Sequence, residues 1–153
     1  MSFSLILIGL SLALLAYWFR YSCLLILRTQ TAEDYSREVC RANGLSFDLV
    51  KGQIEAEPNA NLGALNLEAL YQSLERDYRV VSHLLDQVSM QSQDGNVLET
   101  KLLRANFRVT QVWFQVSHKL GLKSSTGALE EMADTIGHFA NAFGEQSASG
   151  AAA

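Results

Sequence analysis

Residues 67–88, LEALYQSLERDYRVVSHLLDQV, carry the clearest periodic pattern in this chain of 153 residues. Their apolar side chains recur every three or four residues, which is the spacing of one face of an α-helix. Asn66 directly precedes the pattern and is a favoured helix cap. We expect a helix packed along its whole length through Leu67, Leu70, Leu74, Val81, Leu84 and Val88, widened by Tyr71, Tyr78 and Leu85.

A second long helix is predicted after the turn SQDG. Asn96 and Glu99 stand three residues apart at its start, close to the spacing of a capping box. The helix is apolar on more than one side, so we expect it to be the central one. One apolar seam consists of Leu98, Leu102, Ala105, Val109, Val112 and Val116, and further apolar residues outside it are Leu103, Phe107, Trp113 and Phe114.

A third long helix follows the segment SSTG. Gly121 ends the helix before it, and Gly144 is expected to end this one. The tail EQSASGAAA, residues 145–153, has nothing apolar to pack and is predicted to be disordered. The inner face of the helix is predicted as Leu129, Met132, Ile136, Phe139 and Phe143.

Two short helices are predicted ahead of this core. Thr31 can cap one that stops near Gly44, and Ser46 can cap another that ends before Pro58. No alternating strand pattern is present, and short connections favour antiparallel neighbours. The predicted fold is all-α: a small antiparallel bundle over residues 29–144, with three main and two short helices, behind one N-terminal transmembrane helix.

The transmembrane helix is predicted from residues 1–28. The run SFSLILIGLSLALLAYWF contains no charge, and residues 3–19 rise about 26 Å as a helix. We find neither the basic n-region nor the cleavage site of a signal peptide. We expect an uncleaved anchor with an interfacial extension; the alternatives are a buried core helix or a processed leader. For the extent of the span, a tilted helix over residues 3–27 is the alternative.

Arg20 is expected to mark the end of the hydrocarbon core. Aromatic rings around a long cationic side chain are typical of the headgroup interface. Alternatively, Arg20 pairs with a charge inside a larger membrane complex. The predicted interface anchors are Tyr17, Trp18, Arg20, Tyr21 and Arg28.

The orientation of the anchor follows from the basic residues on its C-terminal side, Arg20, Arg28, Arg37 and Arg41. The positive-inside rule predicts a single-pass protein of the plasma (inner) membrane, with its N-terminus outside and its C-terminal domain in the cytoplasm. Cys23 and Cys40 fit a reducing compartment that needs no structural disulfide.

We expect no enzyme, metal or cofactor from this sequence. Along the predicted hairpins His83 and His118 are separated by roughly 21 Å, and His118 and His138 by about 13 Å. Phosphate-binding, nucleophile-elbow and zinc-ligand motifs are missing. Outside the anchor, ten basic residues face sixteen acidic ones, a balance that repels nucleic acid.

A buried ion pair is one place where function could lie. Asp77 occupies a seam position, and the antiparallel register brings it near Arg108. The alternative turns Asp77 outward beside Arg76 or Arg79. A buried charge needs such a partner.

Two surfaces could dock a partner. Leu24 and Leu27 extend the apolar run beyond Arg20 and need cover from lipid or protein. A polar stripe on the second long helix is either a solvated face or a docking surface for an acidic partner, and consists of Arg104, Arg108, Gln111, Gln115 and His118.

These features favour a membrane-anchored, non-catalytic helical interaction module or an accessory subunit of a larger membrane-associated assembly. Its expected partners are the lipid bilayer and a protein partner or a second copy. One alternative is a ligand-binding or enzymatic bundle in which Tyr71, Tyr78 and Trp113 line a pocket. Another is a filament subunit that assembles through the hydrophobic N-terminal helix.

Overall fold

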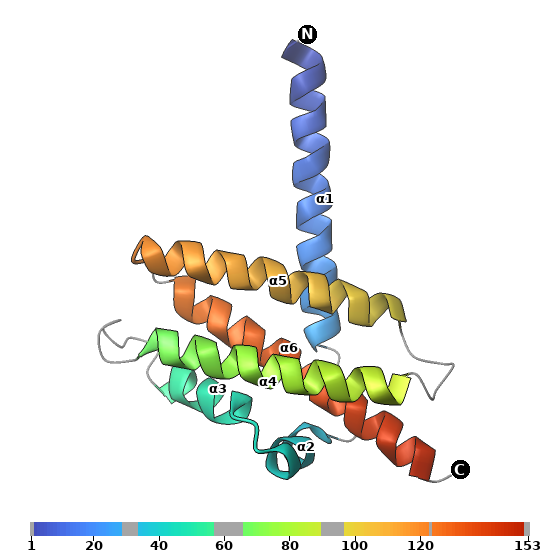
Figure 1. Ribbon diagram of the computed structural model, residues 1–153. Coiled ribbons are helices and arrows are strands. Elements are labelled where there is room, and N and C mark those ends of the chain that lie inside the picture. The colour runs from blue at the N-terminus through green and yellow to red at the C-terminus, as the bar shows by residue number, and fades with distance from the viewer. Residues whose placement is uncertain (1, 29–33, 57–65, 90–96, 123, 152–153) are drawn as a thin grey trace. The chain divides into compact units, whose positions relative to one another are not determined.

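The structure is a computed structural model that describes residues 2–28, 34–56, 66–89, 97–122 and 124–151. Six helices account for nearly all of these residues, and no strand occurs among them (Figure 1). The all-α prediction is therefore confirmed. In chain order the helices are α1 (Ser2–Arg28), α2 (Ser36–Asn43), α3 (Phe47–Ala56), α4 (Leu67–Ser89), α5 (Val97–Lys119) and α6 (Ser124–Ala151).

The chain divides into two compact units, residues 1–30 with α1 and residues 31–153 with the other five helices. In the first unit, α1 is an uninterrupted helix of 27 residues that passes through Arg20. Its stretch Ser4–Arg28 is long and apolar enough to cross a membrane, and among the described helices it alone meets that test. This stretch contains both apolar runs that the sequence suggested.

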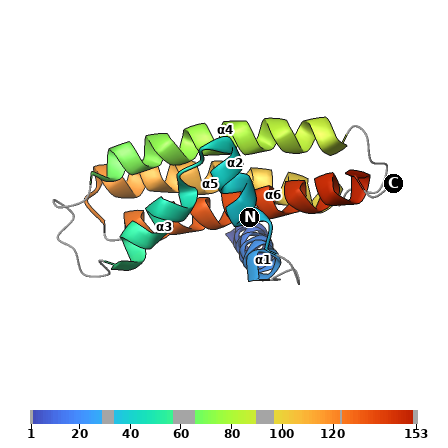
Figure 2. The same cartoon turned by 90° about the horizontal axis from the view of Figure 1, so that it is seen from below.

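The second unit is a bundle built around α6. This helix packs against α2, α3, α4 and α5, while α3 also packs against α2 and α4. Figure 2 shows α4, α5 and α6 as three long neighbours that run in alternating directions, as predicted, with α2 and α3 across them. The prediction that the helix over 97–119 is central was wrong, because α6 takes that place.

The sequence of α6 explains its central position. Leu129, Met132, Ile136 and Phe139 are fully or almost fully buried, as predicted, whereas Phe143 is only half-buried. Small residues extend the buried surface beyond this face, since Ala128, Ala133, Thr135 and Ala140 are buried as well. Small side chains allow neighbouring helices to approach closely on several sides of α6.

The buried face of α4 is centred on its tyrosines. Leu70, Leu84 and Val88, which were predicted to lie on the seam, are only half-buried. Aromatic stacking explains the shift, because the ring centroid of Tyr78 lies 3.7 Å from that of Phe107 in α5. The buried set is spaced four and three residues apart and consists of Leu67, Tyr71, Leu74, Tyr78, Val81 and Leu85.

Several helix ends match the local signals in the sequence. The Asn66 side chain accepts a hydrogen bond from the backbone N–H of Ala69 at 3.1 Å, so it caps α4 as predicted. Gly44, directly after α2, and Gly121, two residues after the end of α5, adopt left-handed φ angles of 61° and 65°. The N-terminal end of α2 differs, because the helix starts at Ser36, and Thr31 lies outside the described residues.

The predicted end of the last helix at Gly144 was wrong. α6 continues to Ala151, so the part of the predicted tail that the structure describes is helical rather than disordered. Gly144 is buried, and a Cβ atom there would overlap Cβ of Tyr35 and lie 2.9 Å from its Cγ. This glycine therefore lets the chain at the start of α2 approach α6, and it does not terminate the helix.

Candidate functional site

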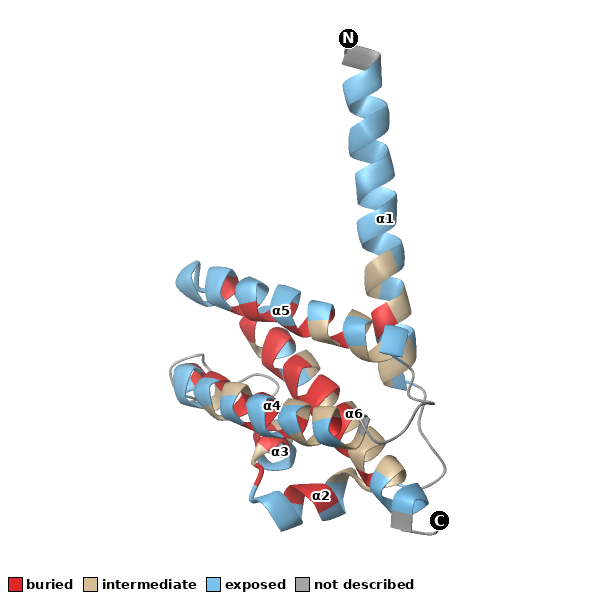
Figure 3. Ribbon diagram, turned by 45° about the vertical axis from the view of Figure 1, so that its right-hand side comes forward, coloured by how far each residue is buried: buried red, intermediate tan, exposed pale blue. Residues whose placement is uncertain are grey.

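The outer face of α5 carries a continuous row of apolar side chains. Leu98 is 73% exposed, Val112 61%, Val116 43% and Leu120 67%, and the rest of the row is similar. Figure 3 shows the buried residues of α5 along one side of the helix and exposed residues along the other. We call this row the outer seam and define it as Leu98, Val109, Val112, Trp113 and Val116 of α5 together with Leu120, which directly follows the helix.

The outer seam overturns the prediction for this helix. The positions predicted to face the core are exposed or half-buried, and the opposite face is buried instead. That inner face consists of Leu103, Asn106, Phe107, Thr110, Gln111, Phe114 and Ser117.

Aromatic stacking against α4 explains why this face is buried. Phe107 and Phe114 stack on Tyr78 and Tyr71 with centroid separations of 3.7 and 4.8 Å. A phenylalanine buries more apolar surface than a valine, and the aromatic pairs add further stabilisation. The face with the two phenylalanine rings therefore packs on α4 and α6, and the valines and Trp113 are left outside.

The polar residues of the inner face are satisfied by hydrogen bonds. The Asn106 amide donates to Glu131 of α6 at 2.7 Å, and the Thr110 hydroxyl donates to the Asn106 carbonyl at 2.9 Å. A buried polar group costs little when it keeps such a partner. These bonds make it possible for Asn106 and Thr110 to be buried while valines on the same helix remain exposed.

The predicted polar stripe lies beside the outer seam and is partly occupied by contacts within the bundle. Arg104 forms an ion pair with Asp86 of α4 at 2.5 Å. Gln111 and Gln115 both donate to the Tyr71 hydroxyl, at 3.4 and 3.3 Å. The remaining two members are exposed: Arg108 donates to Gln111 at 3.3 Å, and His118 stacks on Phe114 with centroids 5.4 Å apart.

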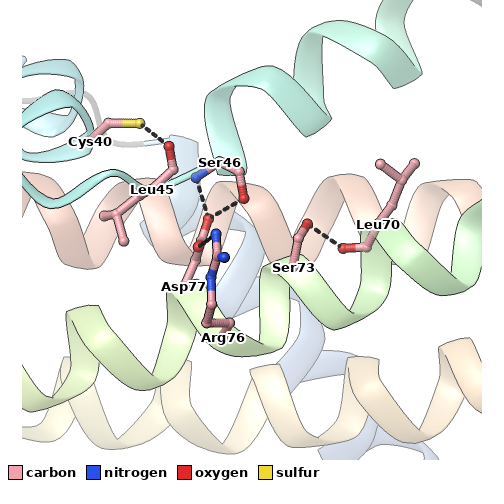
Figure 4. A network of polar contacts seen from close by, with 7 residues as sticks. All are labelled: Cys40, Leu45, Ser46, Leu70, Ser73, Arg76 and Asp77. Atoms are coloured by element: carbon pink, nitrogen blue, oxygen red, sulfur yellow. Dashed lines mark hydrogen bonds and ion pairs between the residues drawn. The ribbon is translucent and has the colours of Figure 1, made fainter.

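Asp77 is completely buried, but its partner is not Arg108. Its carboxylate accepts hydrogen bonds from the backbone N–H of Ser46 at 2.6 Å and from the Ser46 hydroxyl at 3.0 Å (Figure 4). Arg76 adds a longer contact of 3.4 Å. Ser46 directly precedes α3, so the buried carboxylate of α4 caps that helix, where a negative charge is favourable. The predicted pair of Asp77 with Arg108 was wrong.

The three histidines have separate environments. His138 Nε2 lies 2.8 Å from Glu99 Oε1, and His83 Nε2 lies 3.3 Å from the Gln87 amide. His118 stacks on the ring of Phe114. Within the described ranges, no three histidine, cysteine, aspartate or glutamate side chains gather in a way that could hold a metal ion.

Cys40 is a buried thiol in the core of the bundle. Burial raises the pKa of this thiol above its usual 9.0, and its Sγ–H donates to the Leu45 carbonyl at 3.1 Å. No disulfide joins Cys23 to Cys40. A raised pKa makes a reactive thiolate at neutral pH unfavourable, so Cys40 has the properties of a structural residue.

The aromatic residues proposed for a pocket are separated by the packing of α5. Tyr71 and Tyr78 are buried in the stacks with Phe114 and Phe107. Trp113 is 50% exposed on the outer seam. These three side chains therefore do not converge on a common cavity.

The predicted interface anchors lie along the C-terminal half of α1. Tyr17 is 71% exposed, Trp18 64% and Tyr21 56%, so their rings project from the helix. Leu24 is exposed and Leu27 half-buried on the same unbroken helix, which ends at Arg28. The point at which a membrane boundary would cross α1 stays a prediction.

Sequence reasoning missed the outer seam because it assigned these residues to the core. The available signal was the pair of phenylalanines seven residues apart, Phe107 and Phe114, which lie together on the other face. Ser46 was predicted to cap α3 with its side chain, but its hydroxyl donates to Asp77 instead. No protein-family model, curated protein or solved structure matches this chain, so the outer seam of α5 and the apolar helix α1 are the features from which a function must be argued.

Proposed function

We propose that the protein is a membrane-anchored, non-catalytic helical interaction module, an accessory subunit of a larger membrane-associated assembly. The observation that carries this proposal is the outer seam of α5. Its six large apolar side chains are between 43% and 73% exposed on a helix whose other face is already packed. Contiguous exposed apolar surface of this kind usually marks an interaction site.

The free energy available from covering the outer seam is substantial. Full burial of a large apolar side chain contributes about 1.5–3 kcal/mol, so covering the exposed half contributes roughly 1 kcal/mol for each of the six. Several kcal/mol would be enough to favour one bound arrangement once the entropic cost of association has been met. A tethered module meets less of that cost than a free protein does.

The anchor in this proposal is α1. We place residues 1–28 across the plasma membrane with the N-terminus outside, because Arg20 and Arg28 lie at the C-terminal end of the apolar run and Arg37 and Arg41 follow. The bundle is then cytoplasmic. To test this orientation, Ser147→Cys is introduced into a chain whose native cysteines are alanine. A thiol reagent confined to the cell exterior should leave it unlabelled, and labelling in intact cells would refute the orientation.

The docking role of the outer seam can be tested with two charges. Val112→Glu combined with Val116→Glu should leave the bundle folded, because both side chains are exposed, and should weaken the native assembly. Leu49→Glu with Val80→Glu is the matched control, since these exposed apolar residues lie on α3 and α4. The readout is the fraction of each variant that migrates in its native complex after mild detergent extraction.

The two pairs of substitutions give distinct outcomes. Loss of the complex with the α5 pair and not with the control pair supports docking through the outer seam. An intact complex with both α5 glutamates in place contradicts it.

A second docking position is proposed at Leu24 and Leu27. Replacing both with glutamate should leave membrane insertion intact, since residues 3–19 are unchanged, and should weaken assembly if a protein surface covers them. Loss from the membrane pellet would instead mean that the span extends to Leu27, because each charge inside hydrocarbon costs about 2.5–3.5 kcal/mol on insertion scales.

A ligand-binding or enzymatic bundle is the weaker candidate. It requires Tyr71, Tyr78 and Trp113 to share a pocket, whereas the tyrosines are stacked in the core and Trp113 is on the outer seam. Side chains that are already in contact leave no room for a ligand between them.

A further inference from the structure

We infer that the outer seam of α5 binds the anionic headgroup layer of the membrane that holds α1. This inference rests on the proposed function, because it names the partner of the docking surface defined above. Helix α5 would lie in the membrane interface with its apolar side toward lipid, as amphipathic helices do.

The charges of the bundle are segregated in the way this arrangement requires. Four of the ten basic residues after Thr31 lie on α5, and that helix has a single acidic residue, Glu99. The other parts of the chain after Thr31 carry six basic and fifteen acidic residues. An anionic surface therefore attracts α5 and repels the remainder of the bundle, which orients the outer seam toward lipid.

Three of the four basic side chains of α5 border the seam; the fourth, Arg104, pairs with Asp86. Lys101 lies three residues after Leu98, Arg108 precedes Val109, and Lys119 precedes Leu120. The spacings of seven and eleven residues between Lys101, Arg108 and Lys119 are close to two and three helical turns, so all three lie along the same edge of the apolar row. All three are exposed.

Long cationic side chains at such an edge can lay their methylene stems on the apolar surface and reach lipid phosphates. Trp113 sits within the seam and is half exposed, and indole rings are favoured at the headgroup level. The seam from Leu98 to Leu120 covers 22 residue steps, or about 33 Å of helix.

The segment that joins the anchor α1 to the bundle is short, so a membrane crossed by α1 is the nearest large surface to the bundle. Six peptide units separate Arg28 from Asp34, and a fully extended chain of that length spans at most about 20 Å. If α1 crosses the membrane, the bundle is held close to the headgroups, where the effective concentration of lipid is high.

A second copy of the chain fits the same seam less well. In a symmetric antiparallel pair of α5 helices, equivalent edges lie side by side, as equivalent flanking positions do in antiparallel coiled coils. The edge with Lys101, Arg108 and Lys119 would then face the same edge of its partner. Like charges in that arrangement oppose association.

Trp113 provides a direct probe of lipid contact. In a full chain with Trp18→Phe, Trp113 is the one remaining tryptophan. This variant is reconstituted into vesicles of phosphatidylcholine alone and into vesicles with equal parts of phosphatidylglycerol. Quenching by lipids brominated on their acyl chains reports contact with the bilayer, and quenching by acrylamide reports exposure to water.

The inference predicts brominated-lipid quenching in the mixed vesicles, much less in phosphatidylcholine, and reduced acrylamide quenching relative to detergent. Lys101→Gln, Arg108→Gln and Lys119→Gln together should lower the ratio of bound to unbound bundle by about fivefold for each charge, since a basic residue near an anionic surface contributes that much. The matched control removes charge from exposed positions on α4, through substitution of Arg76 and Arg79 by glutamine, and the two variants are compared per charge removed.

Three results would overturn the inference. They are an acrylamide-accessible Trp113 without lipid quenching in mixed vesicles, equal lipid quenching in phosphatidylcholine alone, and an equal effect per removed charge of the α5 and α4 variants. Loss of the native complex with Val112→Glu and Val116→Glu, but no lipid contact by Trp113, would identify a protein as the partner. The proposed function would then stand while this inference fails. If the two glutamates change neither the fraction of native complex nor the quenching of Trp113 by brominated lipid, the proposed function and this inference both fail.

Discussion

Replacing Asp77 with alanine tests how α3 is joined to α4. The wild-type carboxylate is fully buried and accepts hydrogen bonds from both the backbone N–H and the hydroxyl of Ser46, at 2.6 and 3.0 Å. Alanine removes both acceptors and leaves the first turn of α3 without its cap. We expect a large decrease in the free energy of unfolding.

The size of that decrease can be worked from the contacts. A hydrogen bond to a charged group contributes about 1.5–3 kcal/mol, and loss of a helix cap typically costs about 1 kcal/mol. Removing the charge also removes its desolvation cost, which acts in the opposite direction. A net loss of about 3 kcal/mol is expected for Asp77→Ala, and about 1–2 kcal/mol for Asp77→Asn, which keeps one acceptor oxygen but no charge.

The assay is thermal unfolding of the full chain in mild detergent, followed by circular dichroism. A loss of 3 kcal/mol corresponds to a decrease in Tm of roughly 9–15 °C for a bundle of this size. Ser46→Ala should cost about 1 kcal/mol, because it removes the hydroxyl bond and leaves the backbone bond in place.

Two arginine variants show which contact matters. Arg76→Gln should change the free energy of unfolding by less than about 0.5 kcal/mol, since the Arg76 side chain is 62% exposed and its guanidinium lies 3.4 Å from the Asp77 carboxylate. Arg108→Gln should act independently of Asp77→Ala. The reasoning is refuted if Arg76→Gln costs as much as Asp77→Ala, or if Asp77→Ala costs less than about 1 kcal/mol.

Three further predictions follow from the packing. Phe107→Ala should lower the free energy of unfolding by about 3–5 kcal/mol, and Val109→Ala should lower it by less than about 0.5 kcal/mol. Both are measured by urea titration, and equal losses would contradict the assigned inner face of α5. Gly144→Ala should lower the free energy of unfolding by about 1–3 kcal/mol, because the new methyl group overlaps the side chain of Tyr35. Gly127→Ala has open space and should raise the free energy of unfolding by about 0.5–1 kcal/mol. A Gly144→Ala variant more stable than the wild type would refute the close contact. Since burial raises the pKa of Cys40, the alkylation rate of this thiol should begin to rise at a higher pH in the folded chain than in the urea-unfolded chain. The rate is measured with the other cysteine replaced by serine, and coinciding pH profiles of the folded and unfolded chains would argue against burial.

Sequence reasoning located the helices because their signals are local. The three-four spacing of residues 67–88, the Asn66 cap and the turns at Gly44 and Gly121 depend on residues a few positions apart. The apolar run of residues 2–19 needs no tertiary partner to be recognised as a possible membrane span. These features are the ones the structure confirms.

The candidate site could be predicted only in part. The polar stripe with Arg104 and Arg108 was recognised, but the valines beside it were assigned to the core. Both faces of α5 are apolar, and a helix pattern alone does not say which face meets the neighbours. Phe107 and Phe114 decide it, because their partners Tyr78 and Tyr71 lie on another helix.

The sequence by itself therefore determined that the chain is all-α, where most helices start and stop, and that its first helix is apolar enough to span a membrane. The tertiary structure decided that α6 is central, that Gly144 is a packing residue against Tyr35, and that Asp77 bonds Ser46. The physical reason is distance along the chain. Helix formation depends on neighbours within one or two turns, whereas burial depends on how side chains from separate helices compete for the same core.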